Sequence, residues 1–218
     1  MHLQPDPLVD ELRRLAPEAS VSGGSFAYWL PSPRYVLSAE RFNVVERARR
    51  KATATCLTTL LESAGLPPFE PGHLPSGARE WPPGYTGSVS HKGTKVAAVL
   101  SRVGHVISIG IDIETLTGGQ ELRQREGLIA SDELPLDWGV AGSVVLLSAK
   151  EAVFKALNPV VGIRFGYEDV RLSWKEFTPQ GLSGVARFDR IAVEVACTTA
   201  VPSWVGSVAL LSLQPGLS

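Results

Sequence analysis

The spacing of hydrophobic positions divides the first part of the chain into two helices and a loop. Leucines recur at helical intervals over residues 7–16, and Pro17 ends that pattern. A longer helix is expected from about Ser38 to Ala64, because a Ser-Ala-Glu start resembles a cap and Gly65 follows its last turn. Residues 66–87 are rich in proline and glycine and predict a loop without regular elements.

The rest of the chain combines strand-like and helix-like patterns. Strands are expected at Lys95–Ser101 and Val106–Glu114, joined by the tight Arg-Val-Gly-His turn between them. In the second strand isoleucines face one way, and Ser, Gly, Asp and Glu face the other. An apolar run over residues 143–157 predicts a helix that ends at Asn158-Pro159. From Val170 onward the pattern predicts several strands, and without regular βαβ alternation the fold class is α+β.

Composition narrows the class of protein. The 218 residues correspond to one large or two small domains, and 44% hydrophobic with 20% charged residues is typical of a globular chain with a sizeable core. Lys and Arg number 21 against 22 Asp and Glu, a formal net charge of −1. This balance argues against a protein that coats nucleic acid, although it is compatible with a local basic pocket.

The cysteines and the N-terminus bear on the cellular compartment. Two cysteines, Cys56 and Cys197, are too few for a disulfide scaffold or a four-cysteine metal site. We expect two buried free thiols, with a single bridge as the alternative. The N-terminus lacks the pattern of a signal peptide, and the apolar stretch Trp204–Leu213 is too short to span a bilayer. A cytoplasmic protein without a membrane partner is therefore expected.

Two groups of charged residues are candidates for metal chemistry. Asp112 and Glu114 lie two apart at the end of a strand, so both project from one face, and a divalent cation would relieve their repulsion. The ordinary alternative is the polar face of an edge strand. Glu151 and Lys155 lie four apart on a helix, with Lys150 beside them.

For the helical group the ordinary alternative is a capping box, Ser148-x-x-Glu151, with a solvated Glu–Lys pair. The same helix is otherwise almost entirely apolar, so the cluster would need a partner such as a metal or a phosphate.

Cations and hydroxyls gather around His91. Ser-x-Ser-His-Lys, which ends at Lys92, supplies two hydroxyls, an imidazole and an ammonium, a possible anion cradle, although a lone histidine is more often structural. Further cations come from Arg47–Lys51 and from Arg79. For Arg47–Lys51 the ordinary alternative is a solvent-exposed helix face. From the residues alone, these groups indicate a metal-dependent phosphoryl-transfer or phosphohydrolase enzyme.

The order of these groups resembles a known family. Gly87–His91, Gly110–Glu114 and Ser148–Ala156 are similar to the three signature motifs of the 4′-phosphopantetheinyl transferases. More narrowly they resemble the monomeric type that acts on carrier proteins of siderophore, nonribosomal peptide and polyketide synthases. Trp81–Gly84 and Phe165–Asp169 also fit, so the resemblance spans about residues 45–170.

The resemblance implies an activity and a fold. Such enzymes transfer the phosphopantetheine arm of coenzyme A to a serine of an apo acyl or peptidyl carrier protein and release adenosine 3′,5′-bisphosphate, using Mg²⁺ or Mn²⁺. The implied fold is a single-chain pseudo-dimer of two α+β halves, residues 1–103 and 104–218, with the coenzyme A and Mg²⁺ site between them. The implied oligomeric state is a monomer, and the carrier protein would contact residues 115–140. The alternatives are a binding module that has lost turnover and another metal-dependent phosphoryl-transfer enzyme.

The resemblance also implies roles for single residues. Asp112, Glu114 and Glu151 would hold the metal, and Glu151 or a water beside the metal would be the base. Lys155 would assist departure of the leaving phosphate. The residues implied in binding coenzyme A are Arg47, Arg50, Arg79, Ser90, His91, Lys150 and Lys155. Two positions differ from the family pattern. Lys92 follows the motif histidine, and Ala54 stands where many relatives have a second arginine. Arg50, one turn earlier, is the candidate to replace that arginine.

Overall fold

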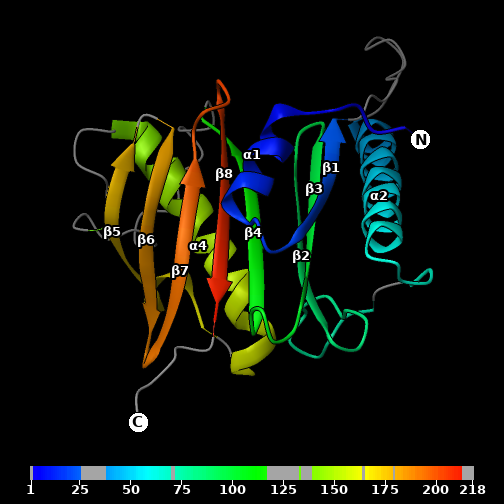
Figure 1. Cartoon of the computed structure of the whole chain (residues 1–218). Coiled ribbons are helices and arrows are strands. Elements are labelled where there is room, and N and C mark those ends of the chain that lie inside the picture. The colour runs from blue at the N-terminus through cyan, green and yellow to red at the C-terminus, as the bar shows by residue number, and fades with distance from the viewer. Residues whose placement is uncertain are drawn as a thin grey trace.

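Two antiparallel sheets stand side by side in the computed structural model, which describes residues 2–25, 38–69, 72–116, 133, 139–163, 165–178 and 180–212 (Figure 1). The first sheet has the order β1-β3-β2 and the second has the order β4-β8-β7-β6-β5. The strands are β1 (Ser20–Ser25), β2 (Tyr85–Lys92), β3 (Lys95–Arg102), β4 (Ser108–Thr115), β5 (Arg171–Thr178), β6 (Gly181–Phe188), β7 (Ile191–Thr198) and β8 (Trp204–Leu211). The expected α+β class is confirmed.

The helices cover different faces of these sheets. Helix α1 (Pro7–Leu15) lies in front of the junction between the sheets, α2 (Ser38–Ser63) lies beside the three-stranded sheet, and α4 (Gly139–Val161) crosses behind the five-stranded sheet (Figure 1). A short 3₁₀ helix, η3 (Tyr167–Asp169), follows α4. Because each helix buries an apolar stripe against a different face, the buried hydrophobic side chains of the described residues form three separate clusters.

Strand β4 is buried on both faces, which explains its isoleucine repeat. Ile109, Ile111 and Ile113 pack toward α1, whereas Gly110 faces α4. A Cβ atom built on Gly110 would lie 1.9 Å from the carbonyl oxygen of Ala152, so glycine permits the close approach of α4 to this strand. The predicted alternation of β4 is confirmed.

Side-chain hydroxyls join the two sheets where β2 meets β4. Ser88 Oγ accepts a hydrogen bond from the Ile111 amide at 3.1 Å, and Ser90 Oγ accepts one from the Ile113 amide at 3.2 Å. Thr86, two residues before Ser88, lies 3.5 Å from Ser108. These contacts give buried amides of β4 an acceptor in place of a neighbouring backbone strand. Because side chains alternate along a strand, Thr86, Ser88 and Ser90 of β2 all face β4, and we call this row of hydroxyl groups the hydroxyl seam.

Several expected boundaries were wrong. Residues 85–92 form strand β2, whereas a loop was expected up to residue 87 and no regular element was expected before Lys95. Strand β1 was not expected either. Gly23 explains the omission of β1, because a glycine-rich segment has low strand propensity, yet here its missing side chain allows close contact with β3. The turn after β3 is present, with His105 N donating to Arg102 O at 3.2 Å, but it leads from one sheet to the other, since β3 pairs with β1 and β2 and β4 pairs with β8.

Helix α4 extends beyond the expected 143–157 at both ends and continues through Pro159. Its length also excludes the capping box, because Ser148 lies in the middle of the helix and accepts a hydrogen bond from Ser207 Oγ at 2.9 Å. Cys56 and Cys197 are buried free thiols, as expected. Within the described ranges, no helix is long and apolar enough to cross a membrane. The two-half pseudo-dimer stays a prediction, and most of residues 115–140 lie outside the described residues.

Candidate functional site

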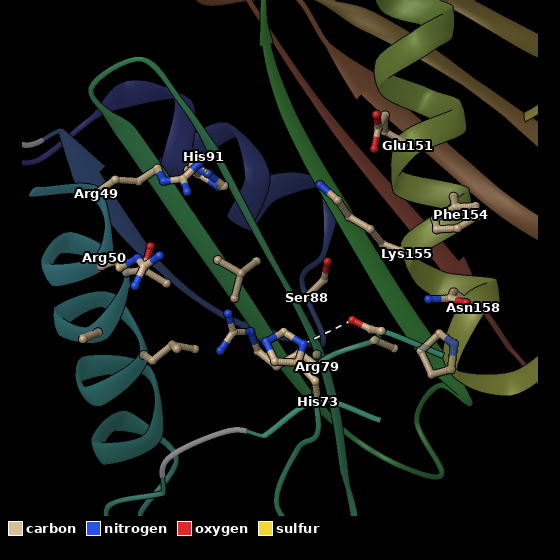
Figure 2. Close-up of a pocket in the computed structure, with 18 of the residues that line it drawn as sticks. Arg49, Arg50, His73, Arg79, Ser88, His91, Glu151, Phe154, Lys155 and Asn158 are labelled. Atoms are coloured by element: carbon tan, nitrogen blue, oxygen red, sulfur yellow. Dashed lines mark hydrogen bonds between the residues drawn. The ribbon is translucent and has the colours of Figure 1, made fainter. Parts of the chain in front are cut away.

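A pocket of about 850 Å³ opens between α2, α4, β2 and the proline-rich loop (Figure 2). Ligand pockets commonly measure about 300–1000 Å³, so this one has room for a large small-molecule substrate. Among the described residues, its lining has four cationic side chains and two carboxylates, an excess of positive charge that favours binding of an anion. These are Arg49, Arg50, Arg79 and Lys155, with Glu46 and Glu151.

Helix α2 supplies one wall through residues at helical spacing. Arg50 Nε donates to Glu46 Oε1 at 2.9 Å, and Arg49 forms an ion pair with the same carboxylate. Hydrogen bonds from Arg50 and Arg49 lower the pKa of Glu46. Cys56 and Leu60 lie two and three turns beyond Arg49 on the same side of the helix and pack into the core, so this side of α2 continues from the core to the pocket wall.

His91 lies at the end of β2 and faces Arg49 (Figure 2). An Arg49 N–H donates to His91 Nε2, so this nitrogen is the acceptor and the ring proton is on Nδ1. Partial burial, together with the positive charges of Arg49 and Lys155, lowers the pKa of His91. The lowered pKa favours the neutral imidazole, which accepts at Nε2 and keeps Nδ1–H as a donor.

Arg79 enters the pocket from the proline-rich loop. Within the described part of the chain its guanidinium has neither a hydrogen bond nor an ion pair, and partial burial lowers its pKa. His73 Nδ1 bonds to the Gly77 carbonyl at 3.2 Å, and Asn158 of α4 donates to the Ser76 carbonyl at 3.3 Å, which closes the loop against α4. An unpaired, half-buried guanidinium is a strong candidate for binding a phosphate.

Helix α4 forms the opposite wall with Glu151, Phe154, Lys155 and Asn158 (Figure 2). Lys155 Nζ donates to the Ile111 carbonyl at 3.0 Å, to Asp112 Oδ1 at 2.8 Å and to Ser90 Oγ at 3.3 Å. Helix α4 is thereby linked to β4 and to the hydroxyl seam. Among the described residues Glu151 has no hydrogen-bond or ion-pair partner.

The three carboxylates expected to bind metal are held apart. Asp112 is paired with Lys155, and Glu114 is paired with Lys92 at 2.7 Å. Over the described ranges, no three His, Cys, Asp or Glu side chains lie close enough together to hold one ion. The donor types nevertheless suit Mg²⁺, which prefers carboxylate oxygens, and both paired carboxylates already attract a cation.

The structure gathers part of the expected coenzyme A set. Four of its seven residues, Arg50, Arg79, His91 and Lys155, line one pocket, together with the candidate base Glu151. Three others lie elsewhere: Arg47 is exposed and donates to the Asn43 carbonyl, Ser90 belongs to the hydroxyl seam, and Lys150 is buried in the core. Ala54, which stands where many relatives have a second arginine, also lines the pocket.

Arg49, Phe154 and Tyr167 also line the pocket. They lie in segments that the sequence had indicated, but none of the three had been assigned a role of its own. Arg49 lies three residues after Glu46, so helical spacing could have indicated it. Phe154 and Tyr167 meet edge to face, with ring centroids 5.7 Å apart, and form an aromatic wall. Nothing in the sequence marks them as pocket residues, since an aromatic on an apolar helix, as Phe154 is, ordinarily belongs to the core, and Tyr167 lies in the short helix η3.

Three curated proteins are similar to parts of this chain. The chain is 34% identical to 4′-phosphopantetheinyl transferase Svp of Streptomyces mobaraensis over 145 residues, 60% of this chain and 56% of that protein. It is 31% identical to 4′-phosphopantetheinyl transferase Npt of Nocardia iowensis over 142 residues, 60% and 61% of the two chains. The resemblance to the 4′-phosphopantetheinyl transferases is confirmed. Enterobactin synthase component D of Escherichia coli (strain K12) is 43% identical over 82 residues, 35% of this chain and 38% of that protein.

The matched part of the chain spans less than two thirds of the length of each of these relatives. No family model matches the chain. Each of the three segments similar to phosphopantetheinyl transferase motifs contributes at or beside the pocket: the first through His91, the third through Glu151 and Lys155, and the second through Asp112, which binds Lys155.

Proposed function

We propose that the chain transfers the 4′-phosphopantetheine arm of coenzyme A to a serine of an apo carrier protein and releases adenosine 3′,5′-bisphosphate. Two of the relatives are named as 4′-phosphopantetheinyl transferases, which supports the transfer. The third is named as a component of enterobactin synthase, which supports a carrier protein of a biosynthetic synthase as the acceptor. The observation that carries the proposal is the meeting, in one large pocket, of an unpaired Arg79, His91 and the Glu151–Lys155 face of α4.

The pocket's charges suit a pyrophosphate and a 3′-phosphate. Arg79 provides an unpaired planar donor for a phosphate, and Arg49 with His91 provides a second donor pair across the pocket. The aromatic wall of Phe154 and Tyr167 offers apolar surface for the uncharged parts of coenzyme A. Positioning plus charge neutralisation is the main source of catalysis in phosphoryl transfer.

The reaction would proceed by displacement at the phosphorus nearer the pantetheine. The serine oxygen forms the new O–P bond while the bond from that phosphorus to the bridging oxygen breaks, and the electron pair leaves with adenosine 3′,5′-bisphosphate. Glu151, which has no partner among the described residues, accepts the serine proton at its carboxylate. Lys155 stabilises the negative charge that develops on the leaving phosphate.

Asp112, Glu114 and Glu151 would hold Mg²⁺, or Mn²⁺ in its place. When bound, the metal supplies charge neutralisation at the pyrophosphate. In the structure two of these carboxylates are bonded to the ammonium groups of Lys155 and Lys92, so metal binding requires both contacts to loosen. Release from Asp112 would free the Lys155 ammonium for the phosphates in the pocket.

The test is to incubate the protein with coenzyme A, Mg²⁺ and a panel of apo carrier proteins and to measure carrier mass. Addition of the phosphopantetheine arm is expected, with loss of at least about 100-fold in rate for Glu151→Gln and on removal of metal with EDTA. Lys175→Met, which changes an exposed lysine on β5, is the matched control and should transfer normally. If coenzyme A binds but no carrier gains mass, the chain is a binding module; if coenzyme A is consumed without a modified carrier, it is a hydrolase.

A further inference from the structure

Lys150 is the largest fully buried side chain of the described residues, with its side chain 1% exposed. Moving an ammonium group out of water carries a large cost unless the group is paired and hydrogen-bonded. The neighbouring Glu151 and the nearby Lys155, one turn along α4, both line the pocket. A buried charge beside two pocket residues raises the question of what Lys150 holds in place.

Lys150 connects α4 to two other parts of the chain. Its Nζ donates to Glu133 Oε2 at 2.8 Å and to the Tyr167 carbonyl at 3.0 Å. Glu133 is 3% exposed, so this ion pair is excluded from solvent on both sides. The two bonds therefore connect Glu133 and the η3 residue Tyr167 to α4.

Glu133 extends the connection to the edge strand of the second sheet. Its Oε1 accepts from the Leu172 amide at 2.7 Å, and its backbone carbonyl accepts from Trp174 Nε1 at 2.9 Å. Both partners lie on β5. A single glutamate thus bonds to α4 and to β5 with both carboxylate oxygens occupied, which gives it one defined position.

We propose that Lys150 and Glu133 are positioning residues that hold the Tyr167 side of the pocket against α4. Tyr167 lines the pocket, and its ring packs edge to face on Phe154 of the same wall. The bond from Lys150 to the Tyr167 carbonyl fixes the backbone from which that ring projects. Lys150 acts through this contact and does not contact the phosphates, contrary to the role implied by the family resemblance. The inference rests on the proposed function only where coenzyme A is named as the pocket's ligand.

The test is a double-mutant cycle with Lys150→Met and Glu133→Gln. Methionine keeps the length of the lysine stem without the charge, and glutamine keeps the oxygen that accepts from Leu172. Each single variant removes one charge of the buried ion pair and keeps the opposite charge, so its melting temperature should fall by about 10 °C. The double variant should fall by clearly less than the sum of the two, because neither charge is left behind. Lys175→Met on exposed β5 is the control and should melt like the wild type.

Coenzyme A binding, measured by calorimetry at a temperature where every variant is folded, separates positioning from direct contact. We expect both single variants to bind about tenfold more weakly, and the double variant to lose less affinity than the sum of the two. Weaker binding in Lys150→Met with unchanged binding in Glu133→Gln would mean that Lys150 contacts the phosphates, and this overturns the proposal. Unchanged binding in both overturns it as well. If the wild type binds no coenzyme A, the proposed function fails. The double-mutant cycle in melting temperature still tests, independently of coenzyme A, whether Lys150 and Glu133 act together to hold this side of the pocket.

Discussion

Gly110→Ala tests how closely α4 must approach β4 for the site to work. A Cβ atom at this position would lie 1.9 Å from the Ala152 carbonyl oxygen and 2.7 Å from the Ala156 amide nitrogen. Both neighbours are backbone atoms of α4, so no side-chain rotation can relieve the contact. The helix would have to move until the shorter distance reaches at least about 3.0 Å, a displacement on the order of 1 Å.

The displacement has two measurable consequences. Overpacking of a core typically costs about 1–3 kcal/mol, which for a chain of this size lowers the melting temperature by about 2–12 °C. Lys155 on the same helix would move away from Asp112, from which it is 2.8 Å distant, and Glu151 would move with it. Since a 1 Å misplacement of reacting groups can lower a rate about 100-fold, transfer to a carrier protein should fall far more than stability explains.

The assay pairs thermal unfolding with carrier mass analysis at a temperature where the variant is folded. Gly72→Ala is the matched control, because its added methyl group would meet only the flexible end of the Glu80 side chain. A Gly110→Ala protein that melts and transfers like the wild type would refute the close helix–strand contact. A protein that loses stability yet keeps full transfer would refute the link between the position of α4 and catalysis.

Two further predictions concern buried titratable groups. Burial by itself raises the pKa of Asp6, but hydrogen bonds from Lys95, Ser25 and the Leu8 amide outweigh it and hold that pKa below its usual value. This stabilisation is present above the unfolded pKa and is lost as pH falls through the folded pKa. Asp6→Asn should therefore lower the free energy of unfolding by about 3 kcal/mol at pH 7, and it should weaken the fall in that free energy between about pH 5 and pH 2, measured by urea titration. An unchanged fall between these pH values contradicts this. Burial raises the pKa of Cys56 to about 11 and that of Cys197 to about 12, so Ellman's reagent at pH 8 should react with neither thiol in the native protein and with both in guanidinium. Rapid native labelling would show that one thiol is accessible.

Helices and strand faces could largely be predicted from the sequence. The long helix was expected at 38–64 and is observed at Ser38–Ser63, and the alternation of β4 was correctly assigned. These features depend on local periodicity, which one segment carries by itself. Strand β1 and the whole of β2 were missed because glycine and serine carry little local strand preference, and their pairing with β3 is decided by a segment distant in the chain.

For the candidate site, the sequence by itself determined which residue types are present and their order in three motifs. That was enough for the family resemblance, and it correctly indicated that His91, Glu151 and Lys155 belong near one another. The positions of these residues along the sequence do not reveal the distances between the helices and strands that carry them, so the interaction partner of each charged group could not be predicted.

Only the tertiary structure decided which charge meets which. Lys155 bonds to Asp112 and Lys150 bonds to Glu133, although the two lysines lie on one helix and looked equally suited to phosphates. The difference is burial: the Lys155 ammonium lies at the pocket wall, whereas the Lys150 ammonium is buried against Glu133 and the Tyr167 carbonyl of η3. A charge enclosed in this way must be neutralised by a partner inside the protein, and that partner is set by how the elements pack rather than by the local sequence.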